Sequence, residues 1–482
     1  MFNLNNIYSR YLRVGIIQRQ SILSFSLQII LTFVGFFGTM YFARVVGADI
    51  LGIYFLFITY FGIISIIADG GFEGAANKRI SEGVEQDEYF TAFFVIRTSF
   101  IVFSIIILLI FRNYFENLNN SGTFFLLIIV LIISILYGTV SSGIIGRGKI
   151  GISSTASFVH NIFQAVFQIV AIYLGYMLFG LICGLIIGMF IAFLLQYHFL
   201  DLHFVRFSWK HIKSLASFSF WGFLISSGTL IFIYSDTLII AHYMNNGDVG
   251  IYRVILQFSS IMLFTTHALC TALFTKVSWW DKNNKKEIIE NTFSKAVTYS
   301  LILTLPILIV GVIFGDKLLY FFYGSKFEDY TTLLILFFVQ MTSVFYILIK
   351  TYLSAINHIK SIFKITLLAA LINIILNLIL IPIIGISGAA LSTLVTMLIS
   401  VIVGKNILKQ KILINIEYKS IFNIIKSTIL IGIIMIIYRI NIQLNNVWLV
   451  LIPIILCGIL YIILILEFDK NIYDELKNIV NT

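Results

Sequence analysis

Residues 90–111 read FTAFFVIRTSFIVFSIIILLIF, and Arg97 is the single charged side chain in this run of 22. A helix of about 20 apolar residues is long enough to cross the roughly 30 Å hydrocarbon core of a bilayer. In hydrocarbon each backbone N–H and C=O must be satisfied within its own segment, which favours a helix. The part Ile101–Phe111 is apolar on every side and lacks the period of two of a transmembrane strand. We therefore predict a membrane-spanning helix here.

The whole chain has the same character. Of its 482 residues 60% are hydrophobic and 11% are charged, and the mean hydropathy is +1.01. An ordinary soluble domain has about 25% charged residues, so a water-soluble enzyme is excluded. The net charge of +10 does not indicate a nucleic-acid partner, because Lys and Arg lie in short loops and form no basic domain.

Apolar runs between charged or turn-rich breaks predict fourteen spans. They lie near residues 22–46, 52–76, 90–111, 122–145, 151–173, 176–199, 215–241, 250–275, 296–314, 331–354, 361–381, 385–404, 421–439 and 447–466. The fold class expected is thus an all-α integral membrane protein. We expect an N-terminal six-helix lobe (1–200), a second six-helix lobe (214–410), two additional helices (421–466) and a cytoplasmic tail (467–482).

Charge fixes the expected orientation. If the N-terminus is cytoplasmic, 25 of the 32 Lys and Arg lie inside, six lie outside, and Arg97 lies within a span. This distribution obeys the positive-inside rule, and a shift by one span would invert it. Both termini are therefore expected in the cytoplasm.

The chain also repeats itself at an offset of 198 residues. The matching positions are Ala43, Gly52, Ile53, Tyr54, Ile63 and Lys78 with Ala241, Gly250, Ile251, Tyr252, Ile261 and Lys276. One period contains six spans, an even number, so both halves have the same orientation. The repeat predicts two parallel lobes around a central cavity, an arrangement used by transporters that alternate access.

Several short segments resemble polysaccharide (O-antigen, Wzx-type) flippases. Residues 43–54, ARVVGADILGIY, are similar to the first loop of that family, with its A-R-x-x-G and G-x-Y pattern. Residues 69–79 resemble the end of its second span, and residues 382–390 resemble the P-x-x-G-x-x-G-A-A entry to its twelfth. Fourteen spans in two six-span lobes are similar to the same family over essentially the full length. The second lobe departs from the pattern, because His242 stands where Arg44 is matched.

The resemblance implies a member of the multidrug/oligosaccharidyl-lipid/polysaccharide exporter superfamily. Such a protein moves a polyprenyl-diphosphate-linked oligosaccharide, the O-antigen repeat unit of lipopolysaccharide for example, from the inner to the outer leaflet of the cytoplasmic (inner) membrane. The implied partners are membrane lipids, this lipid-linked substrate, Na⁺ or H⁺ as coupling ion, and the polysaccharide polymerase machinery. No cofactor is implied.

Polar side chains within the spans are the candidate site residues, because an ionised group at bilayer depth costs about 2.5–3.5 kcal/mol and normally faces water or a partner. For the diphosphate and sugars the candidates are Arg97, Arg253, Lys350, Arg44, Gln257, Asn161 and Gln164. For a coupling cation they are Asp69, Glu73 and Asp236. Many lie on polar stripes of one helix face, as Gln340, Ser343 and Lys350 do on one span and Asn373 and Asn377 on the next.

Each candidate also has a structural interpretation. Arg44, Arg253 and Lys350 lie near span ends, where long side chains snorkel to headgroups. Arg97 lies seven residues inside its span, roughly 10 Å deep by helix rise, so snorkelling explains it least. Asp69 and Glu73, four residues apart, also fit a structural pairing with Lys78 or Arg79. For Asp236 a partner within the lobe and a cation site are both open.

Two other function classes compete. A cation-coupled multidrug-type antiporter of the same superfamily usually has twelve spans, with an acidic residue and a proline in the first. Residues 22–42 contain neither. A membrane glycosyltransferase or polymerase would need paired carboxylates in a long outer loop, and the first outer loop has only Asp49. The sequence has no metal-ligand cluster and no nucleophile motif, so we predict a transporter and not an enzyme.

Overall fold

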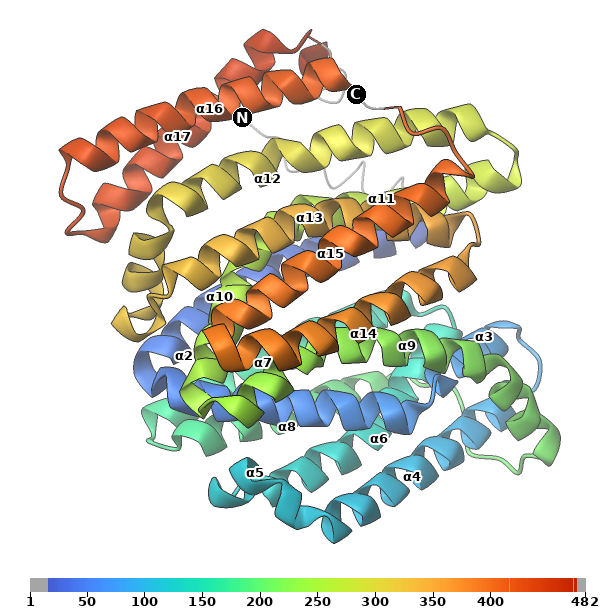
Figure 1. The fold of residues 1–482 in the computed structure, drawn as a ribbon. Helices are drawn as coiled ribbons and strands as arrows, with labels where there is room; N and C mark the ends of the chain where they lie inside the picture. Colours follow the sequence, from blue (N-terminus) through green and yellow to red (C-terminus); the bar gives the residue numbers. More distant parts are fainter. Residues whose placement is uncertain (1–15, 416, 471, 475–482) are drawn as a thin grey trace, which may run out of the picture. The chain divides into compact units, whose positions relative to one another are not determined.

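The computed structural model describes residues 16–415, 417–470 and 472–474. Arg10 and Arg13, counted above as cytoplasmic charges, and the end of the predicted tail (475–482) lie outside the described residues. The described part consists of helices joined by short turns (Figure 1).

The helices follow the apolar runs of the sequence. They are α2 (Ile16–Asp69), α3 (Phe72–Ser81), α4 (Gln86–Ile110), α5 (Glu116–Asn120), α6 (Phe124–Gly146), α7 (Ile150–Tyr173), α8 (Met177–His198), α9 (Trp209–Tyr243), α10 (Asn246–Ser259), α11 (Phe264–Lys282), α12 (Lys286–Tyr323), α13 (Tyr330–Ala355), α14 (Ile359–Ile384), α15 (Ile386–Lys409), α16 (Tyr418–Asn441) and α17 (Val447–Phe468). Short 3₁₀ segments connect some of them, including Ser260–Leu263 between α10 and α11.

The number of spans agrees with the sequence. In the described residues 12 helices are long and apolar enough to cross a membrane, or 13 when the bent pair in α9 counts as one span. The count becomes 14 when α2 is divided at Gly47, where φ of 82° and ψ of 174° separate two helices. A side chain at that left-handed φ would be strained, which explains the glycine in the predicted first loop. The protein is therefore a multi-pass membrane protein with a helical fold.

The second span ends earlier than predicted. Gly70 and Gly71, with φ of 57° and 77°, end α2 and begin α3. Glu73 therefore lies in the first turn of α3 and not in the span assigned to 52–76. The two glycines break a run whose composition looks continuous.

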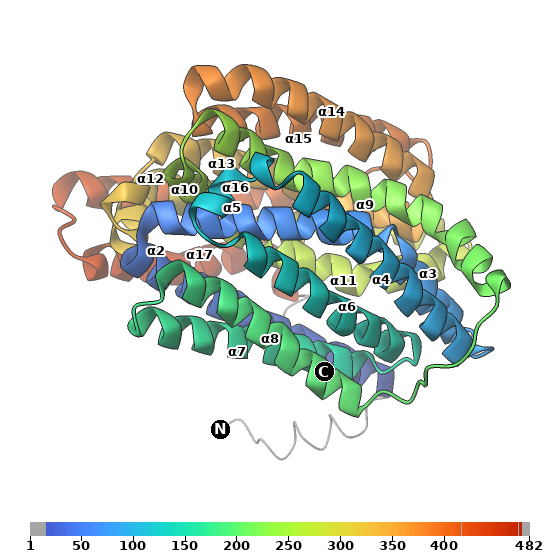
Figure 2. The same ribbon diagram turned by 90° about the horizontal axis from the view of Figure 1, so that it is seen from below.

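Close helix pairs explain the small residues of the sequence. Gly184 and Gly188 of α8 face α7, where an added Cβ would lie 2.5 Å from the Gln168 Cγ and 2.7 Å from the His160 oxygen. The two helices lie side by side in Figure 2. The small-residue stripe of α8 is thus a packing surface.

The chain divides into two compact units, Met1–Leu230 and Ile231–Thr482, with the boundary inside α9. In the second unit α16 and α17 pack on α12. Arg439 of α16 pairs with Asp316 of α12 at 2.9 Å, and the Tyr461 hydroxyl of α17 donates to the Ile302 carbonyl at 2.6 Å. These bonds join the last two helices to the second unit. The lobe boundaries given above stay a prediction.

Candidate transport site

A buried charge cluster lies in the first unit, where α2, α3 and α4 meet. The Arg97 guanidinium of α4 pairs with the Asp69 carboxylate at 3.3 Å and with the Glu73 carboxylate at 3.8 Å. The side chain of Arg97 is 8% exposed, that of Asp69 16% and that of Glu73 44%. We call these three residues the acid–arginine cluster. With two carboxylates and one guanidinium it carries an excess negative charge when all are ionised.

The same cluster begins α3. The Asp69 carboxylate accepts the Glu73 backbone N–H at 3.2 Å, so it occupies a free donor of the first turn. The predicted structural pairing of these acids with Lys78 or Arg79 is wrong. Arg79 pairs instead with Glu82 at 2.9 Å, and the Lys78 ammonium lies over the Phe218 ring. The break at Gly70 and Gly71 turns both carboxylates away from those cations and towards α4.

Gly138 of α6 makes room for the guanidinium. A Cβ at Gly138 would lie 2.3 Å from Arg97 Nη2 and 2.4 Å from its Cζ. On the other side the Phe93 ring lies 5.8 Å from the Arg97 Cζ. The arginine is therefore held between a bare backbone, an aromatic ring and two acids, which fixes its position.

The polar stripe on α7 reaches back to the second span. The Gln164 and Gln168 amides both donate to the Tyr54 hydroxyl, at 3.2 Å and 3.0 Å. Gln168 is buried, whereas Asn161 is exposed and donates to its own helix at the Ser157 carbonyl. Gln164 and Gln168 thus bind to a neighbouring helix of the first unit, whereas Asn161 is accessible.

The second unit holds a different kind of buried charge. The Asp236 carboxylate of α9 accepts the Tyr252 hydroxyl at 2.5 Å, the Asn377 amide at 2.6 Å and the Thr393 hydroxyl at 3.0 Å. Asn373 accepts a further bond from the Asn377 amide at 3.0 Å. Asp236 is 6% exposed, and both asparagines are fully buried. We call these five residues the aspartate cage.

The hydrogen bonds from Tyr252, Asn377 and Thr393 to Asp236 all come from neutral groups, which suits an acceptor-only carboxylate. Within residues 16–474, as far as they are described, no Lys, Arg or His forms an ion pair with it. Arg253, next to Tyr252, interacts electrostatically with Asp236. The Asn377 side-chain oxygen has no hydrogen-bond partner among the described residues. The cage therefore surrounds a buried carboxylate with neutral hydrogen-bond donors.

The other predicted cations are not brought into these clusters. Arg44 is exposed, three residues before the bend at Gly47, and Arg253 and Gln257 are half-buried on α10. Lys350 is half-buried on α13 and makes no hydrogen bond or ion pair in the described part of the chain. Two members of its predicted stripe, Gln340 and Ser343, are buried, and the Gln340 amide donates to Ser259 at 3.1 Å. Lys350 therefore does not share the buried environment of Gln340 and Ser343, with which the sequence grouped it.

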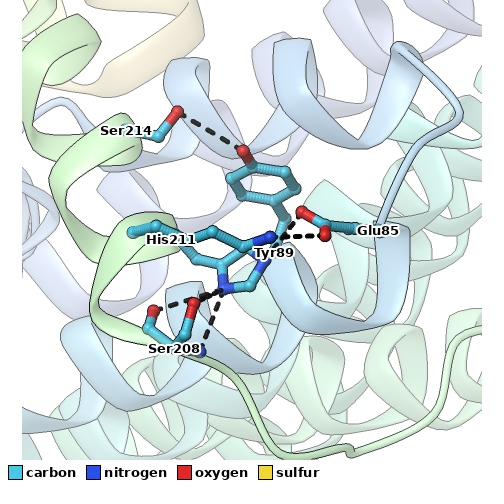
Figure 3. Close-up of polar contacts among 6 residues, drawn as sticks. Glu85, Tyr89, Ser208, His211 and Ser214 are labelled. Atoms are coloured by element: carbon cyan, nitrogen blue, oxygen red, sulfur yellow. Dashed lines mark hydrogen bonds and ion pairs between the residues drawn. The ribbon is translucent and has the colours of Figure 1, made fainter.

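A further polar cluster joins the linker before α9 to the α3–α4 turn (Figure 3). Glu85 accepts from the Lys210 ammonium at 2.6 Å and contacts the His211 Nε2 at 3.0 Å. The Ser208 backbone N–H donates to His211 Nδ1 at 3.0 Å, so Nε2 carries the proton that Glu85 accepts. The hydrogen bond from Lys210 lowers the pKa of the Glu85 carboxyl. We call this cluster the linker latch.

Comparison with known proteins places the chain among its relatives. A family model described as polysaccharide biosynthesis protein matches residues 41–332. The chain belongs to this family. The resemblance found in the sequence is thereby confirmed.

This polysaccharide biosynthesis protein is similar to two proteins of Haloferax volcanii. It is 27% identical over 421 residues to the probable low-salt glycan biosynthesis flippase Agl15, covering 83% of this chain and 85% of the relative. It is 24% identical over 401 residues to the probable flippase AglR, covering 82% and 84%.

Solved structures share its fold. The lipid II flippase MurJ in an inward closed conformation superposes with a TM-score of 0.76 at 20% identity, covering 94% of this chain and all of that one. An inward-facing multidrug resistance MATE family transporter of the MOP superfamily gives a TM-score of 0.66 at 13% identity, covering 81% and 99%. These similarities show the fold alone.

Sequence reasoning missed several members of the sites in this family member. Gly138, Tyr252 and Thr393 look like ordinary residues of apolar helices, and their roles follow only from which helices touch. Asn373 and Asn377 were recognised as a polar pair on one face. Their spacing predicted a polar helix face but not its partner Asp236.

Proposed function

We propose that this protein is a flippase. It moves a polyprenyl-diphosphate-linked oligosaccharide, a surface-polysaccharide repeat unit of the O-antigen type, from the inner to the outer leaflet by alternating access. The observation that carries the proposal is the alignment with a relative named as a glycan biosynthesis flippase over more than four-fifths of both chains. The superfamily fold supports it, and the relatives' names indicate transport rather than catalysis.

For the diphosphate we favour Lys350 among the predicted cations. An ammonium in an apolar helix with no protein counter-charge is stable where water or an anion reaches it. Arg97 is less suited, because two carboxylates already contact its guanidinium. Arg44 and Arg253 remain proposed contacts nearer the outer ends of their spans. The exposed amide of Asn161 and the half-buried amides of Gln164 and Gln257 are proposed to meet the sugars.

For the coupling ion we favour the aspartate cage. Na⁺ and H⁺ are both hard cations that bind oxygen, and the cage offers carboxylate, amide and hydroxyl oxygens on α9, α10, α14 and α15. A bound cation would balance the buried charge of Asp236. Glu73, the most exposed carboxylate of the acid–arginine cluster, is the alternative proton carrier.

The proposal includes the setting. The protein is placed in the cytoplasmic (inner) membrane with both termini inside, and it supplies flipped substrate to the polysaccharide polymerase machinery. Support comes from the positive-inside count, 25 cations inside and six outside. Cysteines introduced at Asn246 should be labelled from outside in intact cells, and those at Lys285 only after permeabilisation. Labelling at Lys285 in intact cells would contradict this orientation.

The proposed function is tested by complementation of a flippase-deficient strain that accumulates a defined lipid-linked glycan. The wild-type chain should restore surface glycan, and the Lys350→Ala variant should restore less at equal abundance.

The cation-coupled multidrug-type antiporter is the second candidate, and the aspartate cage is the observation that favours it. Drug efflux without restored surface glycan would establish the antiporter in place of the flippase.

A further inference from the structure

Five exposed lysines lie at one end of the second unit. Three lie at or beside the turn between α11 and α12, and two lie at or just after the end of α15. We call this set the lysine face. Its members are Lys282, Lys285, Lys286, Lys409 and Lys411.

The two segments of the lysine face touch each other. The Glu290 carboxylate of α12 accepts the Leu413 backbone N–H at 2.7 Å. Ile289 and Ile412, which neighbour those two residues, are buried in the same hydrophobic cluster. The cations that flank these contacts therefore form one surface and not two separate loops.

These cations have no counter-charges of their own. In the described part of the chain none of the five lysines forms an ion pair. Asp281 and Glu287, the acids nearest in sequence, form none either, and Glu290 is bound to Leu413. The lysine face thus keeps its positive charge available for an anion outside the protein.

Exposed apolar side chains lie among the lysines. Trp279 is 55% exposed, Leu413 is 67% exposed and Tyr418 is 76% exposed. The Lys285 ammonium lies 4.8 Å from the centre of the Trp279 ring. Aromatic rings beside Lys stems are characteristic of the boundary between hydrocarbon and headgroups.

Several loop cations of the first unit are paired with acids. Arg79 pairs with Glu82 at 2.9 Å, Lys149 with Asp201 at 2.5 Å and Lys210 with Glu85 at 2.6 Å. Arg206 and Lys213, in the described linker and the start of α9, are exposed and form no ion pair. The lysine face differs because it gathers five such cations on one surface, which gives it charge complementarity to a phosphate-bearing lipid surface.

We propose that the lysine face binds the headgroups of anionic phospholipids in the adjacent leaflet, so that these lipids are enriched at the second unit. The lysines contact the phosphates, and Trp279 inserts at headgroup depth. This inference does not depend on the transported substrate, because a phospholipid of the bulk membrane supplies the anion.

The test uses the full-length protein in phosphatidylcholine nanodiscs with a trace of brominated phosphatidylglycerol or brominated phosphatidylcholine. Trp279 is the reporter, after the other four tryptophans are replaced by Phe. Brominated phosphatidylglycerol should quench Trp279 severalfold more than brominated phosphatidylcholine, and high salt should remove the difference.

The variant Lys282→Gln/Lys285→Gln/Lys286→Gln should make the two lipids quench equally. The matched control, Arg79→Gln/Lys149→Gln/Lys210→Gln, changes three ion-paired cations of the first unit and should keep the preference. If the triple variant fails to fold, Lys409→Gln/Lys411→Gln should still reduce it. Equal quenching in the protein with all its lysines, or an equal loss in the control, would overturn the proposal.

Discussion

The two units bury their charges in opposite ways. In the first, Asp69 and Glu73 are held by a cation of the same unit, the Arg97 guanidinium at 3.3 Å and 3.8 Å. In the second, Asp236 is held by neutral amides and hydroxyls between 2.5 Å and 3.0 Å. Both clusters lie among helices that are otherwise apolar.

We interpret this difference as one between a structural charge and the proposed coupling-ion site. A buried carboxylate paired with arginine gains little from a further cation, whereas one that is hydrogen-bonded by neutral donors still attracts one. Tyr54 and Tyr252, which match in the sequence repeat, differ between the two units in the same way. Tyr54 accepts from two glutamines, and Tyr252 donates to the Asp236 carboxylate. Equivalent positions in the sequence repeat therefore serve different partners.

The largest effect should follow Arg97→Ala. It leaves the mostly buried Asp69 carboxylate and the partly exposed Glu73 carboxylate without their cation. Breaking a buried pair of this kind costs about 3–5 kcal/mol of unfolding free energy. The broken ion pairs predict low abundance and a lower melting temperature, measured in detergent. The double variant Arg97→Ala/Asp69→Asn should regain part of the stability. Unchanged stability in Arg97→Ala would show that these ion pairs do not stabilise the fold.

A smaller loss should follow Gly138→Ala. The new methyl would lie 2.3 Å from Arg97 Nη2, so the guanidinium must move away from its acids. Overpacking of this kind costs about 1–3 kcal/mol. Gly458, where an added Cβ meets nothing within 4 Å, provides the control, and Gly458→Ala should be neutral. Equal melting temperatures for the two variants would contradict the close packing of Arg97.

Much of the fold was predictable because a bilayer imposes strong rules on sequence. The length of an apolar run and the charges at its ends were enough to find fourteen spans. The predicted end of the second span was wrong, because a break at two glycines does not change composition.

The sites were less predictable, since they depend on which helices meet. Arg97, Asp69, Glu73 and Asp236 were found because charge in hydrocarbon is conspicuous. Their partners were not found, because pairing across 28 residues for Arg97 and Asp69 leaves no periodic signal. The role of Gly138 can be recognised only when the position of the Arg97 guanidinium is known.

Lys350→Ala should have a still smaller effect on folding. The ammonium has no partner in the described residues, so its removal should change the melting temperature little or raise it. Flipping of the diphosphate-linked substrate should fall, and Lys350→Arg should retain part of it because the charge remains. Normal flipping by Lys350→Ala would exclude this residue as the diphosphate contact.

The smallest effect concerns pH and the linker latch. The pKa of Glu85 is lowered by its bonds to Lys210 and His211 from an ordinary value of 4.5. A lowered pKa in the folded state means that the stabilisation is complete above the unfolded value and is lost as the pH falls through the lower folded value. Hydrogen exchange in residues 201–214, corrected for intrinsic rates, should rise over that range. Glu85→Gln should show the faster exchange already at neutral pH, and an unchanged pH profile in this variant would assign the effect to another group.

The most direct test of the whole account is flipping in proteoliposomes with a fluorescent polyprenyl-diphosphate oligosaccharide and an imposed Na⁺ or H⁺ gradient. The wild-type protein should flip this lipid faster with one of the two gradients. Asp236→Asn, which keeps the shape of the side chain and removes its charge, should fold normally and lose the response to the gradient. Asp69→Asn should keep that response at reduced stability. A gradient response that persists in Asp236→Asn and disappears in Asp69→Asn would contradict the assignment of the two clusters, and failure of the wild-type protein to flip the lipid would contradict the proposed function itself.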